Sequence, residues 1–197
     1  IIAENSPKLW EKELPYLTPD DHKYARGHVV VVGGSEMTGA AKLAARAARR
    51  TGAGMLSIVA SAAARHIYDT SDAGNLVLEL PEREELSILL NEKRRNAVLV
   101  GPGNGVTDMT RKHSISALKS KKKVVLDADA LTVFESDPDK LFDCITGPCV
   151  LTPHQGEFDR LFKINGDKLF QCREAAKIAN AIIILKGFDT VISEPNG

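Results

Sequence analysis

The sequence predicts an α/β fold with a mainly parallel central sheet and helices on both of its faces. Short runs of apolar, mostly β-branched residues recur along the chain, and segments with amphipathic helical spacing lie between most of them. Within the runs, apolar residues are nearly continuous, which is typical of strands buried on both faces. The runs are His28–Val32, Met55–Ala60, Leu76–Leu80, Ala97–Val100, Val124–Leu126, Val150–Leu151, Ala181–Leu185 and Val191–Ser193.

The composition is that of an ordinary globular protein. The chain has 197 residues, 43% of them apolar, and 26 basic side chains balance 26 acidic ones. This balance argues against electrostatic binding to nucleic acid or to an anionic membrane. No apolar run approaches the roughly 18 residues of a membrane span. Cys144, Cys149 and Cys172 lack metal-ligand spacing and fit idle thiols in a reducing compartment. We therefore expect a cytoplasmic protein without nucleic-acid or membrane partners.

The chain is expected to contain two segments. Residues 1–27 are rich in proline and charge and begin with Ile, which suggests a linker or a junction with a preceding domain. Residues 28–197 show no internal break and are expected to form one domain. Its only dense basic run, Lys119 with Lys121–Lys123, fits a solvated connection.

The first predicted strand leads through the glycine-rich turn Gly33–Gly39 into a helix that ends near Arg50. Such a turn lets the backbone approach a ligand or a phosphate closely, although a plain tight turn explains it equally well. Its glycine spacing does not match the dinucleotide-binding fingerprint. The basic side chains of the helix are expected in solvent. The side predicted to pack on the sheet carries Ala40, Ala41, Leu43, Ala44, Ala47 and Ala48.

The fourth strand is followed by Gly101–Gly105, which has three glycines in five residues. Almost no side chain separates such a turn from whatever lies over it, so a ligand passing close is the favoured explanation. The alternative is a flexible loop with Asp108 capping the next helix.

Two carboxylates, Asp127 and Asp129, follow the fifth strand. They could position a hydroxyl, a ribose or a hydrated magnesium ion, or they could cap the helix that follows. Capping is favoured for Asp129, and the role of Asp127 stays open.

The sixth strand ends in a rigid turn that carries one imidazole and one carboxylate, His154 and Glu157. Pro153 fixes the chain at the strand exit, and a helix is predicted from Gly156 onward. These side chains could converge with Asp127 and Asp129 on one crevice. The alternative is a structural turn capped by Thr152.

The last two strands are joined by Lys186–Thr190, a tight turn whose lysine and backbone amides could hold a phosphate. A β-turn with a solvent-facing lysine is the alternative.

Taken in order, five of these segments are similar to those of a known family. GHVVVVGGSEMTGAAKLAARAARRTGAG, LVGPGNG, VVLDADAL, LTPHQGEF and LKGFDTVI resemble the ribokinase-like NAD(P)H-hydrate dehydratases, and the resemblance covers about residues 22–197. It implies a three-layer ribokinase-like sandwich, with residues 28–197 as a nucleotide- and substrate-binding domain. By this resemblance Ala40, Gly103 and His154 contact the hydrated nicotinamide, and Lys186, Gly187, Phe188, Asp189 and Thr190 bind the adenine nucleotide.

The resemblance also implies an activity, that of a lyase in metabolite repair. Family members use ADP or ATP, with Mg²⁺ carried by the nucleotide, to dehydrate NADHX and NADPHX back to NADH and NADPH. It further implies a homo-oligomer. The segment ENSPKLWEKELPYLTPDDHKYARGH looks like the junction of bifunctional members, in which an epimerase domain for the same damaged cofactor comes first.

One departure from the family pattern concerns catalysis. A Gly-Ser-Gly-Asp motif that supplies the catalytic aspartate normally follows the Lys-Gly-x-x-Thr segment, but the sequence reaches Gly197 without it. We therefore expect a chain truncated at its C-terminus, with the catalytic residue beyond Gly197, and no protein metal ligand is assigned. The alternatives are a ribokinase-like kinase of the hydroxymethylpyrimidine or hydroxyethylthiazole type, whose turn carries Asn where this chain has His154, and a non-catalytic nucleotide-binding remnant.

Overall fold

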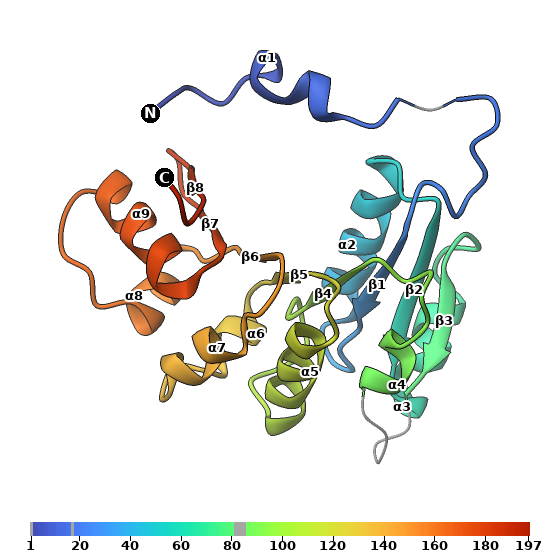
Figure 1. The fold of residues 1–197 in the computed structure, drawn as a ribbon. Helices are drawn as coiled ribbons and strands as arrows, with labels where there is room; N and C mark the ends of the chain where they lie inside the picture. The colour runs from blue at the N-terminus through green and yellow to red at the C-terminus, as the bar shows by residue number, and fades with distance from the viewer. Residues whose placement is uncertain (1, 17, 81–85) are drawn as a thin grey trace.

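The computed structural model describes residues 2–16, 18–80 and 86–197. Its centre is an eight-stranded sheet in the order β3-β2-β1-β4-β5-β6-β7-β8 (Figure 1). Strands β1 to β7 are parallel, and β8 pairs with β7 in the antiparallel direction. The strands are β1 (His28–Val32), β2 (Met55–Ala60), β3 (Leu76–Glu79), β4 (Ala97–Val100), β5 (Lys123–Leu126), β6 (Cys149–Leu151), β7 (Ile182–Leu185) and β8 (Val191–Ser193).

All eight predicted runs form strands, with ends displaced by one residue at most. The predicted fold class, a mainly parallel sheet flanked by helices, is confirmed.

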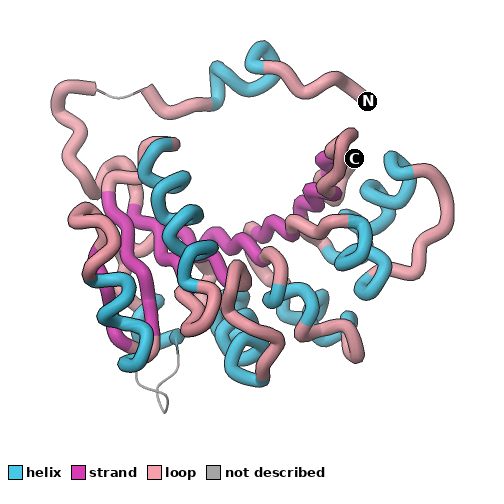
Figure 2. The backbone as a smooth tube through the Cα atoms, turned by 180° about the vertical axis from the view of Figure 1, so that it is seen from behind, coloured by secondary structure: helices cyan, strands magenta, loops and turns pink. Residues whose placement is uncertain are grey.

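Helices lie on both faces of the sheet (Figures 1 and 2). On one face, α2 and α3 pack against β1, β2 and β3. On the other face, α4 to α9 bury their apolar sides in one core with residues of β1 to β7. The helices are α2 (Thr38–Arg50), α3 (Ala62–Asp69), α4 (Leu86–Leu90), α5 (Asp108–Lys119), α6 (Asp129–Thr132), α7 (Pro138–Cys144), α8 (Gln155–Leu161) and α9 (Lys168–Ala179).

Helix α2 buries a narrower stripe than the sequence predicts. Ala41 and Ala45 are fully buried against the sheet, whereas Leu43 is 68% exposed. Ala47, also predicted to face the sheet, is exposed as well. The buried residues are four apart and therefore lie one above the other on the helix, and Leu43 points away from them. Their small side chains let α2 approach the sheet closely.

The helical cover of the sheet is uneven. Side chains of β7 alternate, so that Ile183 and Leu185 are buried under the α4–α9 layer while Ile182, on the opposite face, is 37% exposed. Ile192 on β8 shares that face and is 53% exposed. The expected cover on both faces is therefore seen over β1 to β3, whereas among the described residues the α2 side of β7 and β8 is open to solvent.

The N-terminal segment carries two short helical turns, α1 (Pro7–Trp10) and η1 (Glu11–Glu13), neither of which buries a residue. Residues 1 and 17 of the predicted 1–27 segment lie outside the described residues. In the part of the chain that the structure describes, no helix is long and apolar enough to cross a bilayer.

The three cysteines are buried thiols. Burial raises the pKa of Cys149 to about 12, and burial also raises that of Cys172. A thiol held in this state is a poor nucleophile, because the thiolate is the reactive form.

One buried histidine makes the stability of the fold depend on pH. His28 is 7% exposed at the start of β1, and its Nε2 lies 2.8 Å from the hydroxyl of buried Ser57. Desolvation lowers its pKa from the ordinary 6.5; nearby Arg95 acts in the same direction and Glu92 in the opposite one. As pH falls through 6.5, the unfolded chain takes up a proton that folded His28 resists.

We therefore expect the unfolding free energy to fall as pH drops from about 7 to 5. Urea unfolding at a series of pH values measures this slope. His28→Gln should reduce the slope and leave the part that comes from His113, whose pKa burial also lowers. His66→Gln, at an exposed position on α3, should leave the slope unchanged. Equal slopes for wild type and His28→Gln would assign the dependence to other groups.

Candidate functional site

Because β1 to β7 are parallel, the five segments singled out in the sequence all follow carboxyl ends of strands at one edge of the sheet. This edge is where open α/β sheets bind ligands. The sheet order reverses between β1 and β4, since β1 continues to β2 on one side and β4 to β5 on the other. The site has two parts, one at β1 and β4 and the other at β5, β6 and β7.

In the first part, two glycine-rich loops touch backbone to backbone. A Cβ added to Gly34 would collide with the carbonyl oxygen of Gly103, and a Cβ on Gly103 would collide with that of Met37. Gly103 also has a φ of +72°, a conformation that L side chains rarely adopt. The glycines of these loops were predicted to let a ligand pass close; in the structure the two loops lie against each other.

Two buried or half-buried side chains fix this contact. Asn104 accepts a hydrogen bond from the N–H of Gly101 at 2.7 Å and donates one to the carbonyl of Val32 at 2.8 Å. The Tyr68 hydroxyl, from α3, donates to the carbonyl of Gly34 at 2.7 Å. Burial raises the pKa of Tyr68 to about 12, so the hydroxyl remains a donor at neutral pH. These bonds join the β1 and β4 loops into one unit.

The two carboxylates that the sequence offers as helix caps do not act as caps. Helix α5 is capped by Thr107, whose hydroxyl accepts from the N–H of Thr110, so the capping alternative for Asp108 is wrong. Asp129 is the first residue of α6 rather than its cap, and its Oδ2 accepts from the N–H of Gly105 at 2.8 Å. Asp129 therefore ties the β4 loop to the β5 loop.

A cavity of about 560 Å³ opens beside this contact. The described residues that line it come from the ends of β1, β2 and β4 and from α5; they include Gly103 and the polar side chains of Glu36, His113 and Asp129. Burial lowers the pKa of His113. Ala40 lies at the start of α2, where its N–H donates to Met37, a lining residue.

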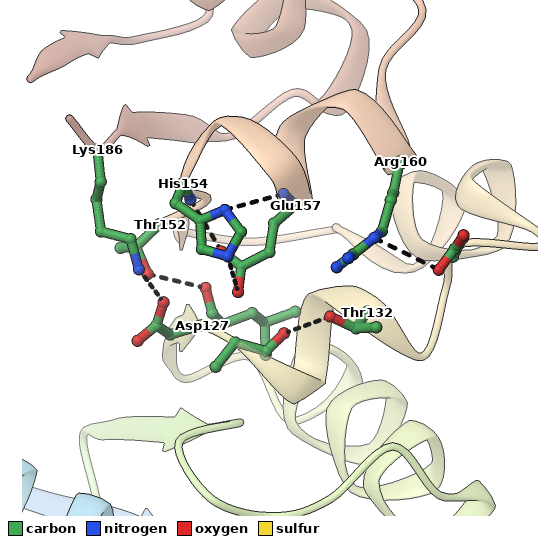
Figure 3. Close-up of polar contacts among 10 residues, drawn as sticks. Asp127, Thr132, Thr152, His154, Glu157, Arg160 and Lys186 are labelled. Atoms are coloured by element: carbon green, nitrogen blue, oxygen red, sulfur yellow. Dashed lines mark hydrogen bonds and ion pairs between the residues drawn. The ribbon is translucent and has the colours of Figure 1, made fainter.

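The second part of the site is built around an ion pair. Lys186 Nζ lies 2.7 Å from Asp127 Oδ1, and the two side chains are 40% and 27% exposed (Figure 3). Thr152 donates its hydroxyl hydrogen bond to the carbonyl of Leu126, next to Asp127. Asp127 therefore pairs with Lys186 and does not cap α6, whose N-cap is Ala128. The alternative of a free, solvent-facing lysine is not observed.

His154 has both a structural and an exposed side. Its Nδ1 accepts from the N–H of Glu157 at 3.2 Å, and the Glu157 carboxylate accepts from the N–H of His154 at 2.9 Å, which completes a capping box at the start of α8. Thr152 is therefore not the cap. Because Nδ1 accepts, the ring proton is assigned to Nε2 in the neutral form. The side chain remains 55% exposed, which leaves the ring available to a ligand.

His154 and the turn Lys186–Thr190 are adjacent in space. The N–H of Lys186 donates to the carbonyl of Pro153 at 2.8 Å, and His154 pairs with Lys186 as an isolated parallel bridge. His154 and Glu157 were predicted to converge with Asp127 and Asp129. His154, Glu157 and Asp127 do lie on one part of the edge (Figure 3), whereas Asp129 is bound to Gly105 in the first part. The two remaining predicted contacts, Ala40 and Gly103, lie in the first part.

The turn between β7 and β8 has the predicted tight form. The N–H of Gly187 donates to Thr190 Oγ1, and that hydroxyl donates back to the carbonyl of Gly187 at 3.0 Å. Phe188 is fully exposed at the tip. Asp189 is held by Lys168, a residue that the sequence analysis missed, and the hydrogen bond from Lys168 lowers the pKa of this carboxyl. No local pattern pointed to Lys168, because it precedes Asp189 by 21 residues and starts a separate helix.

Within residues 2–16, 18–80 and 86–197, no group of three or more His, Cys, Asp or Glu side chains could hold a metal ion. Asp127 and Asp129 are each already engaged, one with Lys186 and the other with Gly105.

Comparison with known proteins identifies the family and the fold. The model of the NAD(P)H-hydrate dehydratase family matches residues 29–197. The chain belongs to the NAD(P)H-hydrate dehydratase family. The match includes all five loops of the candidate site, and the resemblance seen in the sequence motifs is thereby confirmed.

Relatives of this dehydratase-family chain are longer proteins. It is 37% identical over 183 residues to a bifunctional NAD(P)H-hydrate repair enzyme of Archaeoglobus fulgidus, and 34% identical over 191 residues to that of Thermosynechococcus vestitus. These alignments cover 89% and 91% of this chain but 36% and 37% of the relatives. The chain thus spans little more than a third of their length.

Solved structures agree on the fold. The ADP/ATP-dependent NAD(P)H-hydrate dehydratase of Bacillus subtilis, co-crystallised with ATP and Mg²⁺, matches with a TM-score of 0.77 and 27% identity, over 95% of this chain and 69% of that one. A ribokinase-like superfamily protein of Enterococcus faecalis matches with a TM-score of 0.81 over 96% of this chain and 68% of that one. At 24% identity the second match shows the fold alone, and it confirms the ribokinase-like architecture.

The contact between the glycine loops makes a testable prediction about stability. Gly34→Ala should lower the unfolding free energy by about 1–3 kcal/mol, because the new methyl group meets the backbone of Gly103 rather than a movable side chain. Gly39→Ala is the matched control, since a Cβ there meets no atom within 4 Å. On α2 it should be neutral or stabilising by up to about 1 kcal/mol. Urea unfolding of both variants decides; a similar loss in both would refute the proposed packing.

Proposed function

We propose that this chain carries out the ADP- or ATP-dependent dehydration of NADHX and NADPHX, which restores NADH and NADPH. The observation that carries the proposal is the direct link between His154 and Lys186. The turn assigned to the substrate and the turn assigned to the nucleotide share the hydrogen bond from Lys186 to Pro153 and a parallel bridge. A reaction between a nucleotide phosphate and a hydroxylated ring requires these two ligands to be held side by side.

On the substrate side, we assign the contacts with the hydrated nicotinamide to Ala40, Gly103 and His154. Gly103 presents backbone without a side chain at the cavity. The imidazole of His154 is fixed by the start of α8, because Nδ1 accepts from the N–H of Glu157 and Nε2 lies 3.5 Å from the Glu157 carboxylate. The side chain is nevertheless 55% exposed, so an imidazole held in one orientation is presented to a ligand.

On the nucleotide side, we assign Lys186, Gly187, Phe188, Asp189 and Thr190. Lys186 offers an ammonium group held in place by Asp127, and the backbone of the turn is exposed around Phe188. Because Asp127 and Asp129 are engaged in the protein, a magnesium ion would be held chiefly by the nucleotide's own phosphates.

When bound, the nucleotide supplies the phosphoryl group that turns the hydroxyl of the hydrated ring into a good leaving group. The chain's own residues contribute position and charge: Lys186 binds phosphate oxygens, His154 orients the ring, and the Asn104 and Asp129 contacts keep the β4 loop in place. The family's catalytic aspartate belongs to a Gly-Ser-Gly-Asp motif that the printed sequence does not contain, so no acid or base is assigned among these residues.

We further propose the setting in which this activity operates. The relatives are named bifunctional, and residues 1–27 would serve as the junction with a preceding epimerase domain. A cytoplasmic location and a homo-oligomeric state complete this proposal, in keeping with nicotinamide cofactors as substrates.

The test is recovery of NADH absorbance at 340 nm from purified NADH hydrate, with ADP, with ATP and with neither. It should be run on this chain and on the complete product of its gene. Nucleotide-dependent recovery by the complete product confirms the proposed activity. Recovery by that product alone would show that residues outside this sequence supply the catalytic acid or base.

Failure of both proteins to restore NADH would refute the proposal. Phosphorylation of hydroxymethylpyrimidine or hydroxyethylthiazole would then indicate the small-molecule kinase. Binding of ADP without either reaction would indicate a non-catalytic nucleotide-binding domain.

The two ligands should be separable by substitution. His154→Asn should weaken binding of NADH hydrate about tenfold and leave ADP affinity unchanged, since asparagine also caps a helix but lacks the ring. Lys186→Met should do the reverse and weaken ADP about tenfold. Isothermal titration of each variant with each ligand measures both effects.

Lys140→Met on α7 is the control for lost charge, because this exposed lysine lies outside both turns. Equal losses for both ligands in either variant would contradict the division of roles.

A further inference from the structure

Beneath the turn between β7 and β8 lies a lysine that no motif singles out. Lys168 is the first residue of α9, next to the N-cap Asp167, and its side chain is only 20% exposed. Its ammonium donates to the carbonyl of Asp189 at 2.7 Å and to the Asp189 carboxylate at 2.8 Å. A single charged group thus holds both the backbone and the side chain of one turn residue.

The same ammonium also lies directly against residue 187. A Cβ built on Gly187 would collide with Lys168 Nζ, and Asp189 Oδ1 would lie 3.5 Å away. The φ of Gly187 is not in the left-handed region, so a side chain here would act by pushing the Lys168 ammonium aside and not by straining the backbone. Lys168 therefore packs directly against the Cα of Gly187 while it binds Asp189.

The turn is consequently fixed at two points. Lys186, at its start, is joined to Asp127 at the end of β5. Asp189, near its end, is joined to Lys168 on α9. Between these two ion pairs Phe188 is fully exposed. Without the second pair, only the hydrogen bonds between Gly187 and Thr190 would shape the far half of the turn.

An exposed ion pair adds little to global stability, and 75% of the Asp189 side chain is exposed. What Lys168 adds is a restraint on local conformation, because its ammonium is partly buried and bonds a backbone carbonyl as well. Ordering a binding loop in advance improves affinity by removing the ordering cost from the binding step.

We propose that Lys168 is a positioning residue for the nucleotide: it holds the Lys186–Thr190 turn in its binding conformation through Asp189 and Gly187. This inference rests on the proposed function, which places the adenine nucleotide at this turn. Lys168 acts from beneath the turn and stays on Asp189 when the nucleotide binds, so its effect passes through Asp189.

The experiment compares five variants of the full chain with the wild type: four single substitutions and the double variant Lys168→Met with Asp189→Asn. Lys168→Met removes the ammonium, Lys168→Arg keeps a positive donor, and Asp189→Asn removes the partner charge. Lys177→Met is the matched control on the same helix, where Lys177 pairs only with Glu174 at 2.6 Å. Backbone ¹⁵N order parameters of Gly187–Thr190, ADP affinity and the thermal midpoint are measured for each.

In Lys168→Met the order parameters of the turn should fall from about 0.85 toward 0.6. ADP affinity should fall about tenfold while the thermal midpoint moves by no more than about 2 °C. Asp189→Asn should show the same losses, and the double variant should lose no more than either single one. Lys168→Arg should restore most of the affinity, and Lys177→Met should match the wild type.

Two failures are distinguishable. If the wild type does not bind ADP, the proposed function is refuted, and the order parameters still decide whether Lys168 fixes the turn. If the wild type binds ADP but Lys168→Met keeps both its affinity and its order parameters, the positioning role is overturned and the proposed function stands. Additive losses in the double variant would likewise overturn the pathway through Asp189.

Discussion

Parallel pairing of β1 to β7 determines where every functional feature of this chain can lie. Parallel strands all run in the same direction, so the loops that follow their carboxyl ends all lie at the same edge of the sheet. Residues as far apart in sequence as Gly34, Gly103, Asp127, His154 and Lys186 therefore meet within a few neighbouring strand ends. The pairing itself depends on nearly continuous apolar strands, which the helices cover on the α4–α9 face.

The loops within each part of the edge are held by a different kind of interaction. At β1 and β4, loops contact each other through bare backbone, and neutral hydrogen bonds from Asn104 and Tyr68 lock the contact. At β5, β6 and β7, the connections are an ion pair and a capping box. Packing without side chains leaves room for a large organic ligand, whereas lysines held by carboxylates provide localised positive charge. Of the substrate contacts proposed above, Ala40 and Gly103 belong to the first part, whereas His154 lies in the second part beside the proposed nucleotide turn.

The strands and the five loops were predictable because each has a local sequence pattern, a β-branched run followed by glycine, proline or aspartate. The helix caps could not be predicted in this way. Asp108 and Asp129 each begin a helix, but the caps are the preceding Thr107 and Ala128, and a displacement of one residue changes the role of the side chain. Lys186 and Asp127 are 59 residues apart and contact each other. From the sequence we could infer that both lie at the same edge of the sheet, but not that they form an ion pair. Lys168 was missed altogether, since its partner belongs to an element that follows α9.

The open side of β7 and β8 has a consequence for handling the protein. Among the described residues β8 is the outermost strand of the sheet, and Ile192, which lies opposite Ile184 of β7, exposes an apolar side chain on the solvent-facing side. An apolar strand at a sheet margin is a template on which another chain can add a strand, and natural proteins usually blunt such margins with charge. With 26 positive and 26 negative side chains, the molecule also has little net repulsion between copies near neutral pH. We therefore expect that association between folded copies, rather than unfolding, limits the concentration at which this chain stays in solution.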